Sequence, residues 1–364
     1  MTHPAASRAR RRRRSAPRSL GSIGTLLGLA LAWVAACDDE GDPEPLAEGR
    51  IQYDAYCALC HGSQGEGYRS DMANALANQD FLATATDELL RTGTVRGRPG
   101  TPMSPYGAER GGPLSDAQVD AVVAYIRSWQ SRPSIDVHDD EVDGEVERGL
   151  PLYEFHCARC HGDSGEGKRY VSVNNPEFLA VASDGFLRYA TAKGRDGTEM
   201  PGFERELTAQ GIDDLVALMR SWAKKPDDTP YEPPSKDLGE VFVNPGGAEP
   251  PFDPAGRFIG VDDVHQAIQD GRELALLDAR PPSSYVISHI SGAVSVPSYE
   301  GTDFLPQLPP DHWYITYCGC PHSISGQLYD LLVGAGYPKV KVLDEGFFVW
   351  EDRGYPTTEG PEPY

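Results

Sequence analysis

Four of the seven cysteines lie in two close pairs, and a histidine follows each pair directly. The two segments read Cys57-Ala-Leu-Cys60-His61 and Cys157-Ala-Arg-Cys160-His161. An odd number of cysteines, four of them paired in this way, is not typical of a disulfide framework. We therefore interpret these thiols as groups that take part in chemistry.

Two thiols one turn of chain apart can add to the two vinyl groups of haem, and the next imidazole then ligates the iron. A single motif of this kind could equally be a zinc or redox site. Here the surrounding segments, residues 53–67 and 153–167, match each other at an offset of 100 residues. Two motifs in register favour covalent haem, with His61 and His161 as the proximal iron ligands.

A second axial ligand is expected from methionine, because its soft thioether stabilises ferrous iron. Met103 and Met200 both end a Gly-Thr-x-Met segment, 42 and 39 residues after the proximal histidine of their own copy. Met72 and Met219 have no methionine at the matching position of the other copy. A methionine can also fill a hydrophobic core, but the repeated context favours Met103 and Met200 as iron ligands.

The elements that position these residues are predicted to be helical. Each copy closes with an amphipathic stretch, residues 114–129 and 207–222, in which apolar residues recur at three- and four-residue spacing. Ser115 and Thr208 are the predicted N-caps of these two helices.

Residues 45–132 and 146–226 each resemble a class I cytochrome c domain. The resemblance implies two all-α domains, each with a first helix leading into the cysteine motif, a methionine loop and a last helix packed across the first. It implies electron transfer as the function, redox proteins as partners and two haem c groups as cofactors. The implied covalent attachment points are Cys57, Cys60, Cys157 and Cys160, and the implied iron ligand pairs are His61/Met103 and His161/Met200.

The N-terminus predicts export and membrane attachment. Residues 8–18 are rich in arginine, and an uncharged, mainly apolar run follows from Leu20 to Ala36. The ending Val-Ala-Ala-Cys37 resembles a bacterial lipoprotein signal, which implies a signal peptide over residues 1–36, a lipidated Cys37 and a tether to residue 44. The alternative is an uncleaved signal anchor. Both place the protein in the bacterial cell envelope, facing the periplasm or the exterior.

The formal net charge is −22, and removal of the N-terminal segment with its seven arginines leaves about −29. This excess of negative charge argues against nucleic acid and anionic membrane surfaces as partners. We interpret it as a solvated acidic surface.

The last third of the sequence alternates between strand and helix patterns, which predicts a parallel α/β sheet. An acidic linker over residues 133–145 and a Pro-rich linker over 227–254 are expected to separate the domains. The predicted strands are 274–277, 314–317 and 340–343, and the predicted helices are 261–268 and 325–333.

Residues 255–364 resemble a rhodanese domain. The resemblance rests on the segments Leu277-Asp-Ala-Arg280, Tyr285 to Pro297, Tyr317-Cys318, and Leu343-Asp-Glu-Gly346 with Trp350. In that family the cysteine after the central strand carries sulfur as a persulfide, and backbone N–H groups with a helix N-terminus lower the pKa of its thiol. This role falls on Cys318.

The active loop departs from the commonest rhodanese pattern, because it contains no arginine to hold an anionic sulfur donor. His322 could supply a charge or a hydrogen bond, while Cys320 could resolve a persulfide, pair with Cys318 or be inert. Asp278, Arg280 and His289 are interpreted as scaffold residues.

The sequence leaves open whether the chain is an enzyme. Two hypotheses remain. The protein is either an electron carrier whose rhodanese-like domain binds or transfers sulfane sulfur, or a respiratory electron carrier whose rhodanese-like domain is a non-catalytic binding module.

Overall fold

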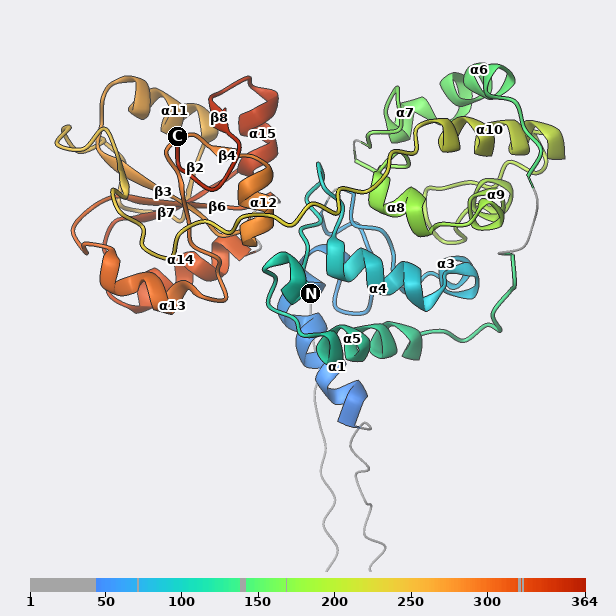
Figure 1. Cartoon of the computed structure of the whole chain (residues 1–364), viewed down its shortest axis with the longest axis horizontal. Coiled ribbons are helices and arrows are strands. Elements are labelled where there is room, and N and C mark those ends of the chain that lie inside the picture. The colour runs from blue at the N-terminus through green and yellow to red at the C-terminus, as the bar shows by residue number, and fades with distance from the viewer. Residues whose placement is uncertain (1–43, 71, 138–141, 168, 320–321, 323) are drawn as a thin grey trace, which may run out of the picture. The chain divides into compact units, whose positions relative to one another are not determined.

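The computed structural model describes residues 44–364, apart from positions 71, 138–141, 168, 320, 321 and 323. The expected signal peptide, Cys37 and most of the tether lie outside the described residues. The described residues belong to one compact unit, whose elements are labelled in Figure 1. Within this part of the chain, no helix is long and apolar enough to cross a membrane.

Two helical domains repeat the same order of elements (Figure 1). The first contains α1 (Glu44–Tyr56), α2 (Ala58–His61), α3 (Gln79–Thr84), α4 (Asp87–Arg96), the 3-10 helix η1 (Ala108–Arg110) and α5 (Asp116–Ser128). The second contains α6 (Val146–His156), α7 (Ala158–His161), α8 (Pro176–Val181), α9 (Asp184–Lys193) and α10 (Ala209–Ser221).

The N-caps predicted for the last helices are confirmed. The Ser115 hydroxyl accepts a hydrogen bond from the backbone N–H of Gln118 at the start of α5, where a capping box forms. The Thr208 hydroxyl accepts one from the Gly211 N–H at the start of α10. These caps fix where each last helix begins, and hence which face it turns to the first helix.

The first and last helices of each domain cross at glycine. A methyl group at Gly49 would run into the carbonyl oxygen of Ala121, and one at Gly149 would run into that of Asp214. The backbones can approach this closely only because neither glycine has a side chain. Beside each crossing a buried tyrosine packs against a tryptophan, Tyr53 on Trp129 and Tyr153 on Trp222.

The two helical domains share one hydrophobic cluster. Val122 and Ile126 of α5 belong to it together with Phe186 and Leu187 of α9. Val137, inside the segment expected to be an acidic linker, is buried in the same cluster. Part of that segment therefore packs against the domains that it connects.

The C-terminal domain is a sheet covered by helices on both faces. The strands of its main sheet run in the order β1-β3-β6-β7-β2, and β5 also pairs with β3. The strands of the domain are β1 (Phe242–Val243), β2 (Phe258–Ile259), β3 (Leu274–Asp278), β4 (His289–Ile290), β5 (Val294–Ser295), β6 (Tyr314–Tyr317), β7 (Val340–Leu343) and β8 (Thr357–Thr358). Of these, β4 and β8 pair in a separate two-stranded sheet. The three predicted strands are confirmed as β3, β6 and β7.

Every residue of β3 is buried because both faces of the sheet are covered. Leu274 and Leu276 pack in the cluster with α11, α12 and α15, while Ala275 and Leu277 pack in the cluster with α13 and α14. These helices are α11 (Val261–Gln269), α12 (Pro282–Ile287), α13 (Gly301–Phe304), α14 (Ile324–Gly334) and α15 (Gly346–Asp352). A short 3-10 helix, η2 (Leu305–Gln307), follows α13.

The sheet differs from the expected all-parallel arrangement at one edge. β1 pairs antiparallel with β3, and it comes from the Pro-rich segment expected to be a linker. Val241 and Val243 are buried in the domain core. Prolines are tolerated around this strand because it is an edge strand, and a two-residue strand is too short to give a periodic sequence pattern.

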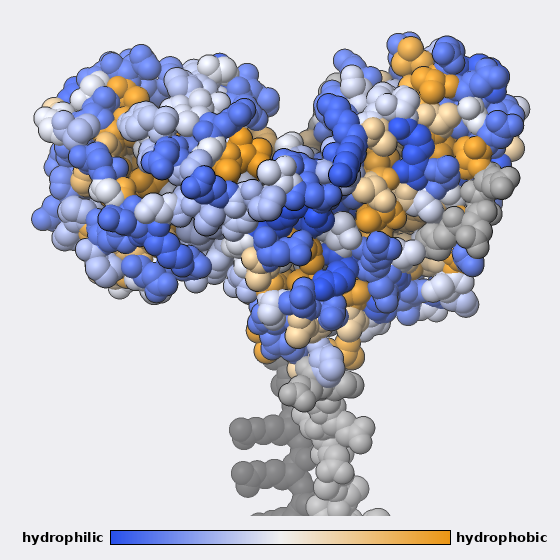
Figure 2. All heavy atoms as spheres, viewed as in Figure 1, coloured by the Kyte–Doolittle hydropathy of each residue, from blue (hydrophilic) through white to orange (hydrophobic). Residues whose placement is uncertain are grey.

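Figure 2 shows a face that is mainly hydrophilic, interrupted by apolar patches.

The helix crossing in the second domain generates a prediction. Gly149→Ala should lower the stability of the domain by at least ~1–3 kcal/mol, because the methyl group meets backbone that cannot move aside cheaply. Gly211→Ala is the matched control, since its methyl would lie 3.3 Å from the flexible tip of Leu152. Urea unfolding followed by helical circular dichroism checks the pair. Equal midpoints for the two variants would contradict the tight crossing.

Candidate functional site

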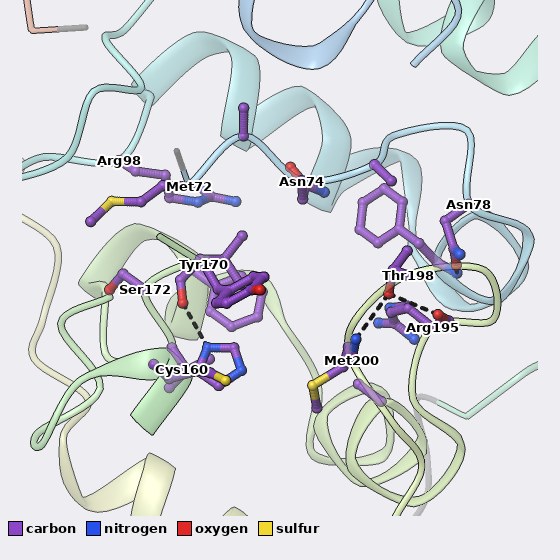
Figure 3. A pocket seen from close by; sticks show the side chains of 18 of the residues that line it. Met72, Asn74, Asn78, Arg98, Cys160, Tyr170, Ser172, Arg195, Thr198 and Met200 are labelled. Carbon is purple, nitrogen blue, oxygen red and sulfur yellow. Dashed lines mark hydrogen bonds between the residues drawn. The ribbon is translucent and has the colours of Figure 1, made fainter. Parts of the chain in front are cut away.

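One cavity of about 620 Å³ lies among the helices and loops of the two helical domains. Figure 3 shows side chains of both domains around it, including Met72 and Arg98 of the first and Tyr170 and Met200 of the second. All eight residues predicted to hold haem line this cavity, namely Cys57, Cys60, His61, Met103, Cys157, Cys160, His161 and Met200.

Each cysteine motif folds as a single turn of helix. In the first domain the backbone N–H of His61 donates to the Cys57 carbonyl at 2.9 Å, and the turn ends at Gly62 with a φ of 82°. Residues three and four apart share a face of a helix, so Cys57, Cys60 and His61 point to the same side. The second motif forms the same turn. The local fold thus presents two thiols and one imidazole together.

The two imidazoles are held in the form that can bind a metal. His61 Nδ1 lies 2.9 Å from the carbonyl oxygen of Asn74, and His161 Nδ1 lies 2.8 Å from that of Val171. A carbonyl only accepts hydrogen bonds, so Nδ1 carries the proton and Nε2 keeps its lone pair. Burial lowers the pKa of both histidines, against a smaller opposing effect of these hydrogen bonds.

The two methionines sit at the ends of closed loops. The Arg98 N–H donates to the Met103 carbonyl at 2.7 Å, and the Arg195 N–H donates to the Met200 carbonyl at 2.9 Å. The Thr101 hydroxyl closes the first loop further by accepting from the Met103 N–H. Thr198 does the same in the second loop, as Figure 3 shows beside Met200.

The thiols of the motifs are not poised to act as free nucleophiles. Burial, with the neighbouring Cys60, raises the pKa of Cys57 to about 12. Burial, with the neighbouring Cys160, raises the pKa of Cys157 to about 11. A reactive thiolate needs the opposite shift. The setting suits side chains that are consumed in thioethers.

Two arginines that the sequence reasoning missed line the same cavity. Burial lowers the pKa of Arg98 and of Arg195 to about 10. Among the described residues, neither forms a salt bridge, and each guanidinium group donates a hydrogen bond to the carbonyl of the glycine just before it. Haem carries two carboxylates, so two partly buried guanidinium groups that form no salt bridge within the described chain fit such a ligand. The sequence signal that could have identified them is the repeated pattern Gly-Arg-x-Gly-Thr-x-Met, in which the arginine recurs five residues before each methionine.

The other two methionines have different surroundings. Met219 also borders the cavity, but it is buried in the shared hydrophobic cluster. Met72 lines the cavity but has a φ of 63°, and its N–H donates to the Arg169 carbonyl of the second domain.

The third site predicted from the sequence is a separate one in the C-terminal domain. Cys318 directly follows β6 and is 1% exposed. Its sulfur lies 3.1 Å from the Ser325 hydroxyl at the start of α14. His322 has a φ of 69°, and its Nε2 lies 2.5 Å from Asp344. Cys320 lies outside the described residues.

Asp278 and Arg280 form an ion pair in the core of this domain, with a 2.6 Å contact. The Arg280 guanidinium also stacks on Phe347, 4.1 Å from the ring centre. His289 is fully buried, and its Nδ1 contacts the Tyr285 carbonyl. The Arg280 guanidinium also donates to the Ser288 carbonyl, so these contacts tie the end of β3 to the segment 285–289.

Comparison with known families gives three matches. Residues 46–130 match the family described as cytochrome c, and residues 144–219 match the cbb3-type cytochrome c oxidase subunit III family. Residues 260–353 match the rhodanese-like domain.

Two curated relatives each align with somewhat more than half of this chain. The cbb3-type cytochrome c oxidase subunit CcoP of Azospirillum sp. (strain B510) is 27% identical over 56% of this chain. The alignment spans 63% of that relative, so the chain covers less than two thirds of its length. The cytochrome bc1 complex cytochrome c subunit of Mycobacterium tuberculosis is 26% identical over 58% of this chain and 79% of that protein.

Among solved structures, the rhodanese-like domain of the Anabaena sp. Alr3790 protein is 24% identical. The alignment covers 29% of this chain and 81% of the solved domain, with a TM-score of 0.28. The three family matches show cytochrome c-type domains followed by a rhodanese-like domain.

The buried histidines predict a pH dependence. The unfolded chain takes up protons near the ordinary histidine pKa of 6.5, whereas the folded domains keep His61 and His161 neutral to lower pH. Stability should therefore fall as the pH drops below 6.5, by up to ~1.4 kcal/mol per pH unit for each histidine. Urea unfolding of the haem-free chain across this range measures the slope. A His61→Gln, His161→Gln double variant should flatten it, and an unchanged slope would refute the explanation.

Proposed function

We propose that this chain, in which cytochrome c-type domains precede a rhodanese-like domain, is a membrane-anchored extracytoplasmic electron carrier with two haem c groups. One observation carries the proposal. Both cysteine motifs and both loop methionines, from segments far apart in the sequence, line a single largely apolar cavity.

The residues of the chain divide the work of holding the cofactors. The four motif cysteines would form the thioethers, and His61 and His161, through Nε2, would ligate the irons together with Met103 and Met200. A haem c with histidine and methionine ligands supplies one-electron transfer. Because a histidine and a methionine of the chain would ligate each iron, no ligand position would remain for a substrate, which favours electron relay over oxidase or peroxidase chemistry.

The location is proposed from the N-terminal sequence. An arginine-rich segment, an apolar run and Cys37 support export and lipid attachment in the bacterial envelope. The relatives are named as subunits of a cytochrome c oxidase and a cytochrome bc1 complex. We propose redox proteins as the partners of this chain on the same grounds.

For the rhodanese-like domain we propose binding or transfer of sulfane sulfur. The Cys318 thiolate attacks the outer sulfur of a persulfide or thiosulfate donor, so a Cys318 S–S bond forms and the donor leaves as a thiolate or sulfite. No net electrons move in this step. Cys60 packs against the hydrophobic cluster that contains Cys318, which supports a link between the sulfur site and the first haem site.

A second candidate is a non-catalytic binding module. It is favoured by the burial of Cys318, which is 1% exposed and so poorly accessible to a donor. In this case the domain would recognise a partner without forming a persulfide.

The haem content tests the carrier proposal. A pyridine haemochrome assay should give about two c-type haems per chain, and the double variants Cys57→Ser/Cys60→Ser and Cys157→Ser/Cys160→Ser should each lose one, because each removes one pair of attachment points. Cys318→Ser is the control and should keep both haems. Retention of both haems in either double variant would overturn the assignment.

Sulfur chemistry is tested on the oxidised chain. Thiosulfate or polysulfide should yield thiocyanate from cyanide, and Cys318→Ser should abolish this reaction, because the outer sulfur of the donor then has no acceptor thiol in the domain. Reduction of the haems by ascorbate serves as the control and should be unchanged in the variant. Equal thiocyanate formation in wild type and variant would favour the binding-module function.

A further inference from the structure

Each methionine loop is held by an asparagine from the other helical domain. The Asn175 side chain donates from Nδ2 to the carbonyl oxygen of Pro99 at 2.9 Å. The Asn78 side chain donates from Nδ2 to the carbonyl oxygen of Asp196 at 2.8 Å. Pro99 lies in the loop that ends at Met103, and Asp196 lies in the loop that ends at Met200. Figure 3 shows Asn78 beside the loop that carries Arg195, Thr198 and Met200.

The two asparagines occupy matching positions and use both ends of the amide. Asn78 Oδ1 caps its own helix α3 by accepting from the Phe81 N–H, and Asn175 Oδ1 caps α8 by accepting from the Phe178 N–H. The cap serves the asparagine's own domain, while the Nδ2 donor serves the other domain. A serine hydroxyl could also cap the helix, but serine has no amide group to donate the hydrogen bond to the other domain.

Residues next to the two asparagines also contact the opposite helical domain, at matching positions. Asp80, two residues after Asn78, accepts a hydrogen bond from the Asp196 N–H at 2.8 Å. Glu177, two residues after Asn175, pairs with Arg96 at 2.6 Å and is largely buried. The guanidinium of Arg98 lies over the ring of Phe178 in the second domain. That of Arg195 lies over the ring of Phe81 in the first.

This pattern is the contact expected of a two-fold interface, in which each partner offers the same patch to the other. We propose that Asn78 and Asn175 are positioning residues, each of which holds the iron-ligating methionine loop of the other domain. The proposal rests on the proposed function in one respect, that Met103 and Met200 are the iron ligands.

The consequence is that the two redox centres depend on each other's folding. Internal hydrogen bonds shape each loop, but its outer residues are exposed, and Pro99 and Asp196 are tied down through their carbonyls across the interface. Loss of one such hydrogen bond should raise the population of the open loop by about five-fold. The methionine of the domain opposite the substitution should then leave its iron more often.

The experiment uses the full oxidised haem protein and imidazole, which replaces an axial methionine when the loop opens. Met103→Ala and Met200→Ala first assign the two kinetic phases and the two shifted methyl NMR signals of bound methionine to their domains. Asn175→Ser should then accelerate imidazole binding about five-fold at the first iron and shift the Met103 methyl signal. Asn78→Ser should do the same at the second iron, with Met200.

A matched control distinguishes this role from a purely local one. Asn174→Ser removes a neighbouring asparagine whose Nδ2 bonds only to Ser164 of its own domain, and it should leave the first iron unchanged. The proposal is overturned if Asn175→Ser affects the second iron alone, both irons equally or neither. If the wild-type protein lacks the two methyl signals, the ligand assignment in the proposed function fails, and this proposal falls with it.

Discussion

Both proposed haem sites depend on one local interaction, the hydrogen bond from imidazole Nδ1 to a backbone carbonyl. For His61 the acceptor is Asn74, and for His161 it is Val171. The bond selects the tautomer whose Nε2 can bind iron and fixes the plane of the ring. Burial adds to this, because it keeps the imidazole uncharged. Every other feature of the site, from the helix crossings to the closed methionine loops, arranges groups around this fixed nitrogen.

A shared interior explains why the chain carries two copies of a domain rather than two separate proteins. The copies bury apolar residues against each other in one cluster and line one cavity. Partly buried arginines at matching positions, Arg98 and Arg195, place two positive charges in that cavity, where low polarity strengthens their effect on a bound anion. The arrangement favours two cofactors that are close in environment and linked through the protein.

The rhodanese-like domain is built on different physics. Its central strands are buried on both faces, and an internal ion pair, Asp278 with Arg280, ties a strand end to the following segment. Breaking such a pair would leave an uncompensated charge in the core, so it fixes the local geometry. Within this framework Cys318 lies directly after β6, with its sulfur beside the Ser325 hydroxyl.

The sequence by itself determined the features that depend on short spacings. These include the cysteine motifs, the caps at Ser115 and Thr208, the buried strands, and the Gly-Thr-x-Met segment that ends at Met103 and again at Met200. Each of them is a pattern within a few residues or a direct repeat. Only the tertiary structure decided that both motifs line one cavity, that β1 arises from a Pro-rich segment, and that asparagines reach across domains. Asn175 lies 76 residues from Pro99 and Asn78 lies 118 from Asp196, and no local periodicity encodes contacts at such separations.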